Sequence, residues 1–132
     1  MINAIGLKKS YGAGESRTEV IKGIDIKISD GDFVAILGAS GSGKSTLLNV
    51  LSGLERPDNG SILYGDTDIT TLTDTELTKF RKNTIGFIFQ QYYLLPNLTV
   101  EKNVRMGADL ANNKEYGEII NAVGLENKAK KY

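Results

Sequence analysis

The stretch Gly38-Ala39-Ser40-Gly41-Ser42-Gly43-Lys44-Ser45 is the strongest structural signal in this sequence. It matches the phosphate-binding pattern G-x-x-x-x-G-K-[ST], which has meaning when a strand precedes it and a helix follows it. An unbroken apolar run at 33–37 precedes the stretch, and residues 46–52 follow it with apolar side chains at helical spacing, up to Gly53. The stretch is therefore predicted to be a nucleotide-binding loop, and not a glycine-rich turn that fits the pattern by chance.

The residue types in this loop suit a polyphosphate ligand. Glycines let the backbone curl so that several N–H groups point at the phosphates, and the N-terminus of the following helix adds a partial positive charge. The Lys44 ammonium is expected to reach the β- and γ-phosphates, and the Ser45 hydroxyl is expected to coordinate Mg²⁺. The residues expected to bind the nucleotide here are Gly38, Ser40, Gly41, Ser42, Gly43, Lys44, Ser45 and Thr46.

Composition limits the possible classes of protein. The chain has 132 residues, of which 40% are hydrophobic and 24% are charged, so one ordinary globular domain is expected. Sixteen basic residues balance sixteen acidic ones, which provides no broad positive field for nucleic acid. The absence of cysteine and histidine excludes disulfides, thiolate metal sites and imidazole chemistry from these residues. No apolar run has the length of a membrane span and no signal peptide is recognisable, so a cytoplasmic location is expected.

Antiparallel strands are predicted on either side of the loop. Residues 2–7 are compatible with a short strand, and alternating isoleucines at 24–28 predict a half-buried one. The turn signal Asp30-Gly31 predicts a hairpin from that strand into a buried strand at 32–37. A second turn, at 57–60, leads into a predicted strand at 61–64.

The second half of the chain is predicted to alternate helix and strand. Thr73 and Glu76 form a capping box, and Leu72 and Leu77 have the spacing of a hydrophobic staple, so a helix begins there. The apolar run 85–89 predicts another buried strand, after which residues 90–96 leave the sheet as a loop. Helices are expected at about 100–110 and 114–123, the latter ended by Gly124. The expected fold class is α/β, with a phosphate-loop nucleotide-binding core, an N-terminal antiparallel β-subdomain and the start of a helical subdomain.

With these motifs in place, the chain resembles the N-terminal part of an ATP-binding subunit of ABC transporters. Four stretches carry the resemblance: Tyr11 after two lysines, 38–46, 53–60, and 85–90 followed by 94–104. They occur in the family's order and span nearly all of the chain. The loop at 12–19 is similar to that of the subgroup that exports lipoproteins, macrolides and antimicrobial peptides.

The resemblance implies roles for further residues. Tyr11 would stack on the adenine of ATP, and Val20 would flank the same base. Gln90 stands where the family has a glutamine that ligates Mg²⁺ or orients the attacking water, so Lys44 and Gln90 are the candidate catalytic residues. The implied cofactors are ATP and Mg²⁺. The expected division of the chain is an ATP-binding core with its β-subdomain at 1–90 and the beginning of a helical subdomain at 91–132.

The resemblance also implies partners. The family's ATPase subunits act in pairs and sit at the inner face of the membrane on an integral-membrane permease. The apolar loop Tyr92–Pro96 would line the groove that receives a cytoplasmic helix of that permease. The alternative is that these side chains pack beneath the two helices that follow.

Three family motifs do not occur in these residues: the signature segment, the apolar strand that ends in Asp-Glu, and the switch histidine. Ser61–Asp66 is no substitute for the second, because a glycine precedes its acid and no glutamate follows it. The chain is therefore expected to be an incomplete domain that binds ATP without hydrolysing it efficiently alone, although the intact protein would be an ATPase. Uncovered strand edges would favour self-association or domain swapping.

Three other classes of phosphate-loop protein share the glycine-rich loop. A GTP-binding switch protein would carry Asn-Lys-x-Asp, but Lys130 stands where the aspartate is required. A small-molecule kinase would need basic residues that close over the phosphates, whereas Lys79, Arg81 and Lys82 suit the C-terminus of a helix. A non-catalytic nucleotide-binding module remains a serious alternative for these residues.

Overall fold

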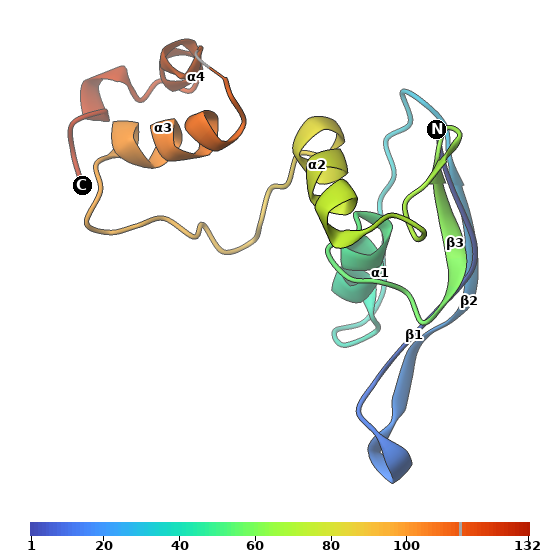
Figure 1. Ribbon diagram of the computed structural model, residues 1–132. Coiled ribbons are helices and arrows are strands. Elements are labelled where there is room, and N and C mark those ends of the chain that lie inside the picture. Colours follow the sequence, from blue (N-terminus) through green and yellow to red (C-terminus); the bar gives the residue numbers. More distant parts are fainter. Residues whose placement is uncertain (114) are drawn as a thin grey trace. The chain divides into compact units, whose positions relative to one another are not determined.

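The computed structural model describes residues 1–113 and 115–132 (Figure 1). The chain divides into two compact units, Met1–Ile85 and Gly86–Tyr132. We call them the first and the second unit and describe each by itself.

The first unit is built on a four-stranded antiparallel sheet. Strands β1 (Ile2–Tyr11) and β2 (Thr18–Ile28) form a long hairpin whose connection contains the short 3₁₀ helix η1 (Gly14–Ser16). Strands β3 (Asn59–Tyr64) and β4 (Thr67–Asp68) complete the sheet in the order β2-β1-β3-β4. The strands predicted at 2–7, 24–28 and 61–64 are thus confirmed as parts of longer elements.

The hairpin partner of β2 differs from the prediction. The sequence favoured a hairpin from 24–28 into 32–37, but β2 pairs with β1 in a register that places Ile28 opposite Ile2. The turn at Asp30 and Gly31 does form, with the Asp32 backbone N–H donating to the Ser29 carbonyl at 3.2 Å. The chain leaves the sheet after this turn and continues into the glycine-rich loop.

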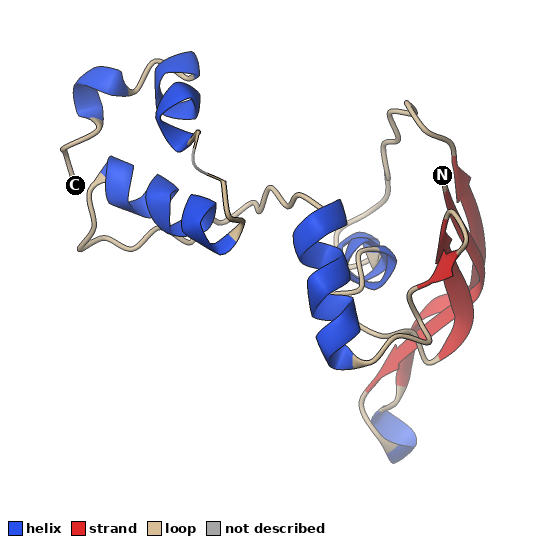
Figure 2. Ribbon diagram, turned by 45° about the horizontal axis from the view of Figure 1, so that its top comes forward, coloured by secondary structure: helices blue, strands red, loops and turns tan. Residues whose placement is uncertain are grey.

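Two helices cover one face of this sheet (Figures 1 and 2). Helix α1 (Lys44–Leu51) follows the glycine-rich loop, and α2 (Asp74–Thr84) begins at the predicted capping box. Between the sheet and the helices lies one hydrophobic core, which has side chains from every one of these elements except β4. Its fully buried large members are Leu7, Ile21, Val50, Ile62 and Ile69.

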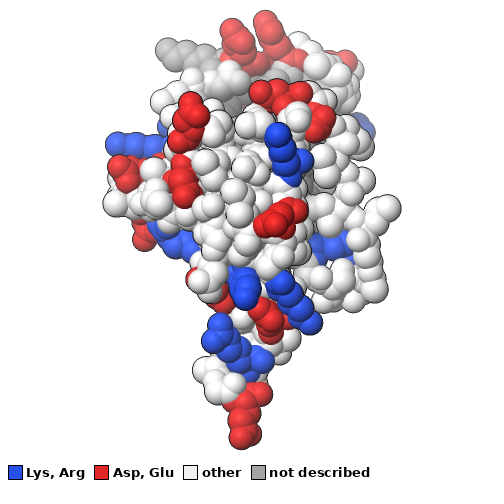
Figure 3. Space-filling model, turned by 90° about the vertical axis from the view of Figure 1, so that its right-hand side faces the viewer, with Lys and Arg blue, Asp and Glu red and all other residues white. Residues whose placement is uncertain are grey.

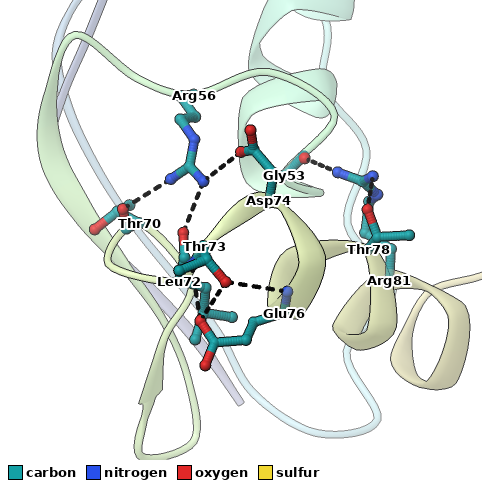
Figure 4. A network of polar contacts seen from close by, with 9 residues as sticks. All are labelled: Gly53, Arg56, Thr70, Leu72, Thr73, Asp74, Glu76, Thr78 and Arg81. Carbon is teal, nitrogen blue, oxygen red and sulfur yellow. Dashed lines mark hydrogen bonds and ion pairs between the residues drawn. The ribbon is translucent and has the colours of Figure 1, made fainter.

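Polar contacts tie the two helices together (Figure 4). Arg56 donates to the backbone carbonyls of Thr70 and Leu72 and pairs with Asp74 at 2.8 Å, which holds the start of α2. Arg81, near the other end of α2, donates to the Gly53 carbonyl at 2.6 Å, just beyond the end of α1. Both ends of α2 are thus fixed to the segment that follows α1.

The two apolar runs that predict buried strands do not form strands. Phe33 is 98% exposed and Leu37 is 90% exposed, and Ile88 in the second run is also fully exposed. A strand needs a hydrogen-bonding neighbour, and none of the described segments pairs with either run. The prediction of paired strands at 32–37 and 85–89 is wrong for this structure, although their apolar composition is that of buried strands.

The second unit is helical. Helix α3 (Val100–Leu110) is capped by the Thr99 side chain, which accepts from the Lys102 backbone N–H. Helix α4 (Tyr116–Ala122) and the 3₁₀ helix η2 (Glu126–Lys128) follow. The helices predicted at 100–110 and 114–123 are confirmed, except that residue 114 lies outside the described residues.

Charged side chains of both signs are mixed on the face of the molecule drawn in Figure 3. Lysine and arginine do not gather there into a continuous basic patch.

Candidate functional site

Two glycines of the glycine-rich loop leave little room for a side chain, and one of them, Gly43, also has a left-handed backbone. Gly43 has φ +92°, and a Cβ atom there would lie 2.7 Å from Cγ1 of Val20. A Cβ atom on Gly38 would lie 2.8 Å from Oγ of Ser42. The loop is therefore closed tightly on itself and against β2, which leaves its backbone, and not side chains, to face a ligand.

Helix α1 begins directly from this loop, with Gly43 as its N-cap residue and without a side-chain cap. The first N–H groups of any α-helix have no partner within the helix, so those at the start of α1 are available to an anion. The earliest helical hydrogen bond here runs from the Leu47 N–H to the Gly43 carbonyl at 2.8 Å. The arrangement fits the phosphates of a nucleotide.

The Lys44 side chain is folded over the loop. Its Nζ donates to the carbonyls of Gly38 at 2.9 Å and Ala39 at 2.7 Å. The ammonium is thus held by the backbone of the first two loop residues. Ser45, which is exposed, and Thr46, which is half-buried, follow Lys44 in the first turn of α1.

Val20 lies directly against this loop. Besides the close approach of its side chain to Gly43, its carbonyl oxygen would lie 3.4 Å from a Cβ atom there. Val20 also borders a small hollow of about 160 Å³, together with Ile24, Leu47 and the loop residues. It therefore supports the loop, and its predicted place beside a nucleobase stays a prediction.

Tyr11, at the end of β1, is held by residues to which the sequence had assigned no role. Its hydroxyl donates to the Glu55 carboxylate, which also accepts from Nδ2 of Asn49 in α1 at 3.0 Å. The hydrogen bond to Glu55 raises the pKa of Tyr11, and the Thr46 hydroxyl opposes this with a smaller lowering effect. Because Asn49 belongs to α1, the Glu55 carboxylate joins Tyr11 to the helix that begins at the phosphate loop.

Sequence patterns could not reveal the contact between Tyr11 and Glu55, because 44 residues separate them. The contact depends on the pairing of β1 with β3, together with hydrogen bonds just before β3. The Asp58 N–H donates to the Lys8 carbonyl at 2.8 Å, and the Ser10 N–H donates to the Asp58 carboxylate at 2.8 Å. Glu55 did lie in the resembling stretch 53–60, which was the only available hint.

Gln90 belongs to the second unit, where it lies exposed in the loop that precedes α3. Its predicted part in Mg²⁺ binding and hydrolysis stays a prediction.

The apolar loop after Gln90 borders a hollow of about 490 Å³ within the second unit. Asn103 holds this loop in place: its Oδ1 accepts from the Leu95 N–H at 2.8 Å, and its Nδ2 donates to the Leu95 carbonyl at 3.1 Å. Tyr92, at 87% exposed, and Tyr93 do not pack beneath the following helices. The residues that line the hollow are Leu94, Leu95, Pro96, Leu98, Val100, Asn103, Val104, Leu125 and Tyr132.

A family model described as ABC transporter matches residues 21–132 of the chain. The chain belongs to the ABC transporter family. The resemblance drawn from the sequence is therefore confirmed. The fold class is confirmed as well: it is that of an ABC ATP-binding cassette, of which the chain covers a part.

Curated relatives agree with this family. The chain is 41% identical to the bacitracin export ATP-binding protein BceA of Halalkalibacterium halodurans, over all of the chain and 54% of that protein. It is 40% identical to the lipoprotein-releasing system ATP-binding protein LolD of Geobacter metallireducens, over 95% of the chain and 58% of that protein. The chain thus spans a little more than half the length of these ABC relatives, which are of the export type that the loop at 12–19 indicated.

A solved ABC structure matches as well. A dimeric structure of the ATP-binding cassette MJ0796, in a post-hydrolysis state bound to ADP and Pi, has a TM-score of 0.84 and 34% identity. The match covers 98% of the chain and 60% of that cassette. None of the helices in residues 1–113 and 115–132 has the length and apolar character needed to cross a membrane.

Proposed function

We propose that this chain is the ATP-binding part of an ABC transporter subunit that powers export through a membrane permease. The observation that carries the proposal is the phosphate loop: a backbone closed against β2 at Gly43, an uncapped helix start, and the Lys44 ammonium held by the loop backbone.

ATP would bind with its triphosphate along residues 38–45. Lys44 would exchange its two carbonyl partners for the β- and γ-phosphate oxygens, and Ser45 would supply a hydroxyl ligand to Mg²⁺. Bound Mg²⁺ neutralises phosphate charge. Tyr11 would offer its ring to the adenine, Val20 would border the same region, and Gln90 would complete the Mg²⁺ and water contacts.

Binding and hydrolysis are expected to need different parts of the protein. The present residues supply the groups that hold phosphates, whereas the family's base carboxylate and its histidine do not occur among them. The chain alone is therefore proposed to bind Mg-ATP without efficient turnover. In the intact protein, a second ATPase subunit would close over the bound nucleotide.

The permease would engage the apolar loop of the second unit. Loop residues 92–95 are aromatic or aliphatic and exposed, and they adjoin the apolar hollow beside α3. An exposed apolar patch of this kind marks a partner site, and a cytoplasmic helix of a permease is the partner that suits an ABC subunit. Attachment there would hold the protein at the inner face of the cell membrane.

Calorimetric titration of the chain with Mg-ATP and with Mg-GTP tests this function. We expect ATP binding, and we expect Lys44→Ala to weaken it by about 2–3 kcal/mol because a charge-assisted phosphate contact is lost. Lys79→Ala, which removes the same charge from the exposed side of α2, is the matched control and should change nothing. Equal ATP affinity of wild type and Lys44→Ala would contradict the proposal, and a strong preference for GTP would indicate a switch protein.

A hydrolysis assay on the same samples separates the remaining alternatives. We expect no turnover from the chain alone. Turnover that disappears in Lys44→Ala would show that the described residues suffice for catalysis, and phosphate transfer to an added small acceptor would indicate a kinase.

A further inference from the structure

Glu55 connects the aromatic ring of Tyr11 to the helix that starts at the phosphate loop. One carboxylate oxygen accepts from the Tyr11 hydroxyl, and the other accepts from Nδ2 of Asn49 at 3.0 Å. The backbone of Glu55 is fixed to the same helix, since its N–H donates to the Asn49 carbonyl at 3.1 Å. Glu55 is thus held at two points on α1 and presents its carboxylate to the end of β1.

A second group restrains the same ring. The Lys9 ammonium lies 5.5 Å from the centroid of the Tyr11 ring, within the range of a cation–π contact. Lys9 is itself held, because its Nζ donates to the Arg56 carbonyl at 2.8 Å and lies 3.8 Å from the Asp58 carboxylate. One side of the ring therefore carries a fixed cation, while 42% of the Tyr11 surface stays exposed.

The protonation states favour this contact at neutral pH. The Tyr11 hydroxyl, and after it the Asn49 amide, lowers the pKa of Glu55, while the same hydrogen bond raises the pKa of Tyr11. Tyr11 is thus a protonated donor and Glu55 an ionised acceptor. The contact is of the charge-assisted kind, which is stronger than a hydrogen bond between neutral groups.

We propose that Glu55 is a positioning residue for the nucleobase: it fixes the Tyr11 ring relative to α1, so that the free side of the ring meets the base of a nucleotide whose phosphates lie in the loop. The proposal rests on the proposed function, since it needs a nucleotide in that loop. An aromatic ring that is already held in its stacking position loses less conformational entropy when the base arrives. Glu55 acts through Tyr11 and has no role toward the phosphates.

Comparison of two ligands separates the base from the phosphates. Mg-ATP and Mg-tripolyphosphate are titrated by calorimetry into wild type, Glu55→Ala, Tyr11→Phe and the double variant. Tyr11→Phe keeps the ring and removes only the hydroxyl, and it leaves the bond between Glu55 and Asn49 intact. Glu118→Ala on α4, which removes one exposed negative charge from the second unit, is the matched control.

We expect Glu55→Ala and Tyr11→Phe each to weaken ATP binding by about three- to ten-fold, the effect of losing one hydrogen bond. The double variant should be no weaker than either single one, because both remove the same contact. Tripolyphosphate affinity should be the same in all five proteins. Unchanged ATP affinity in both single variants, or equal weakening of both ligands, would overturn the role of Glu55 and leave the proposed function standing. If wild type binds neither ligand, the proposed function and this inference both fail.

Discussion

At the scale of single residues, the close approach of Gly43 and Val20 gives the phosphate loop its shape. The loop turns into α1 through a left-handed residue, and the branched side chain of Val20 lies where any Cβ atom at that residue would have to go. A valine on β2 therefore sets the position of the first N–H groups of α1. The sequence indicated why glycine is needed for phosphate binding, but not which neighbour excludes a larger residue.

Gly43→Ala is expected to damage both folding and binding. The left-handed backbone costs an L-residue about 1–2 kcal/mol, and the clash with Val20 adds to this figure. Thermal melting and ATP titration would measure the two effects. Gly41→Ala is the matched control for the melting experiment, because Gly41 has φ +77° but nothing within 4 Å of its Cβ position. We expect it to show the backbone cost alone.

The double variant Val20→Ala/Gly43→Ala separates clash from strain. Gly43→Ala should lower the melting temperature more than Gly41→Ala does. Removal of the valine methyl groups should recover this difference. If Val20→Ala brings no recovery, the valine does not shape the loop.

At the scale of elements, α2 shows how a local signal fixes a helix boundary. The Glu76 carboxylate accepts from the Thr73 backbone N–H at 2.8 Å and from the Thr73 hydroxyl at 2.7 Å, and the Glu76 N–H donates back to that hydroxyl (Figure 4). These partners are three residues apart, so the sequence alone was enough to predict the boundary. Helix α3 also begins at a local cap, since the Thr99 side chain accepts from the Lys102 backbone N–H.

Thr73→Ala is expected to destabilise the first unit by about 1 kcal/mol, the usual effect of losing an N-cap side chain. Urea unfolding followed by circular dichroism would measure it. Thr75→Ala, at an exposed threonine in the first turn of the same helix, is the matched control and should be neutral or slightly stabilising. An equal loss in both variants would contradict the capping role.

The contact between Thr73 and Glu76 should also make the stability of the first unit depend on pH. The Thr73 side chain, more than its backbone, lowers the pKa of Glu76 from the ordinary value of 4.5. A lowered folded-state pKa contributes stability above the unfolded value, and this contribution is lost as the pH falls through the folded value. The difference in stability between wild type and Glu76→Gln should therefore be full at neutral pH and shrink below pH 4.5. A difference that stays constant down to pH 3 would exclude ionisation as its source.

Strands were harder to predict from this sequence than helices. Apolar runs at 33–37 and 85–89 have the composition of buried strands, but a strand depends on a neighbour that the run itself does not encode. Capping residues are local, whereas strand partners and the contact between Tyr11 and Glu55 are distant in sequence. Helix boundaries and the phosphate loop were therefore predictable, while the partner of β2 and the support of the Tyr11 ring were not.

The apolar loop of the second unit is predicted to couple the permease to ATP hydrolysis. Tyr93 adopts a left-handed backbone with φ +49° and lies edge-to-face against Phe89 at 5.3 Å, and Asn103 holds Leu95 beside the hollow. In an intact subunit with its permease, Tyr93→Ala and Leu95→Ala should reduce permease-stimulated hydrolysis and leave ATP binding unchanged. Ile119→Ala on α4, a half-exposed residue outside the hollow, is the control. Unchanged stimulation, or unfolding of both variants, would rule out the coupling role.

At the scale of the whole molecule, the chain presents apolar side chains that a monomer rarely exposes. Phe33, Leu37 and Ile88 lie on segments outside the strands and helices of the described residues, so the backbone N–H and C=O groups of these segments are not engaged in a sheet. Segments with these two properties are templates for strand pairing between copies. The charged surface in Figure 3 is of mixed sign, so no strong net charge opposes such association.

We therefore expect the chain to self-associate in solution, with strand pairing through 32–37 or 85–89 and with domain swapping as one route. Light scattering over a dilution series should show a mass that rises with concentration. Phe33→Ser and Ile88→Ser should shift the distribution toward the monomer, because each removes apolar area from one segment and leaves the core of the first unit intact. Leu110→Ser, at an exposed position at the end of α3, removes a comparable apolar side chain outside both segments and should not shift it. A monomer at every concentration, or an equal response to all three variants, would show that these segments do not mediate association.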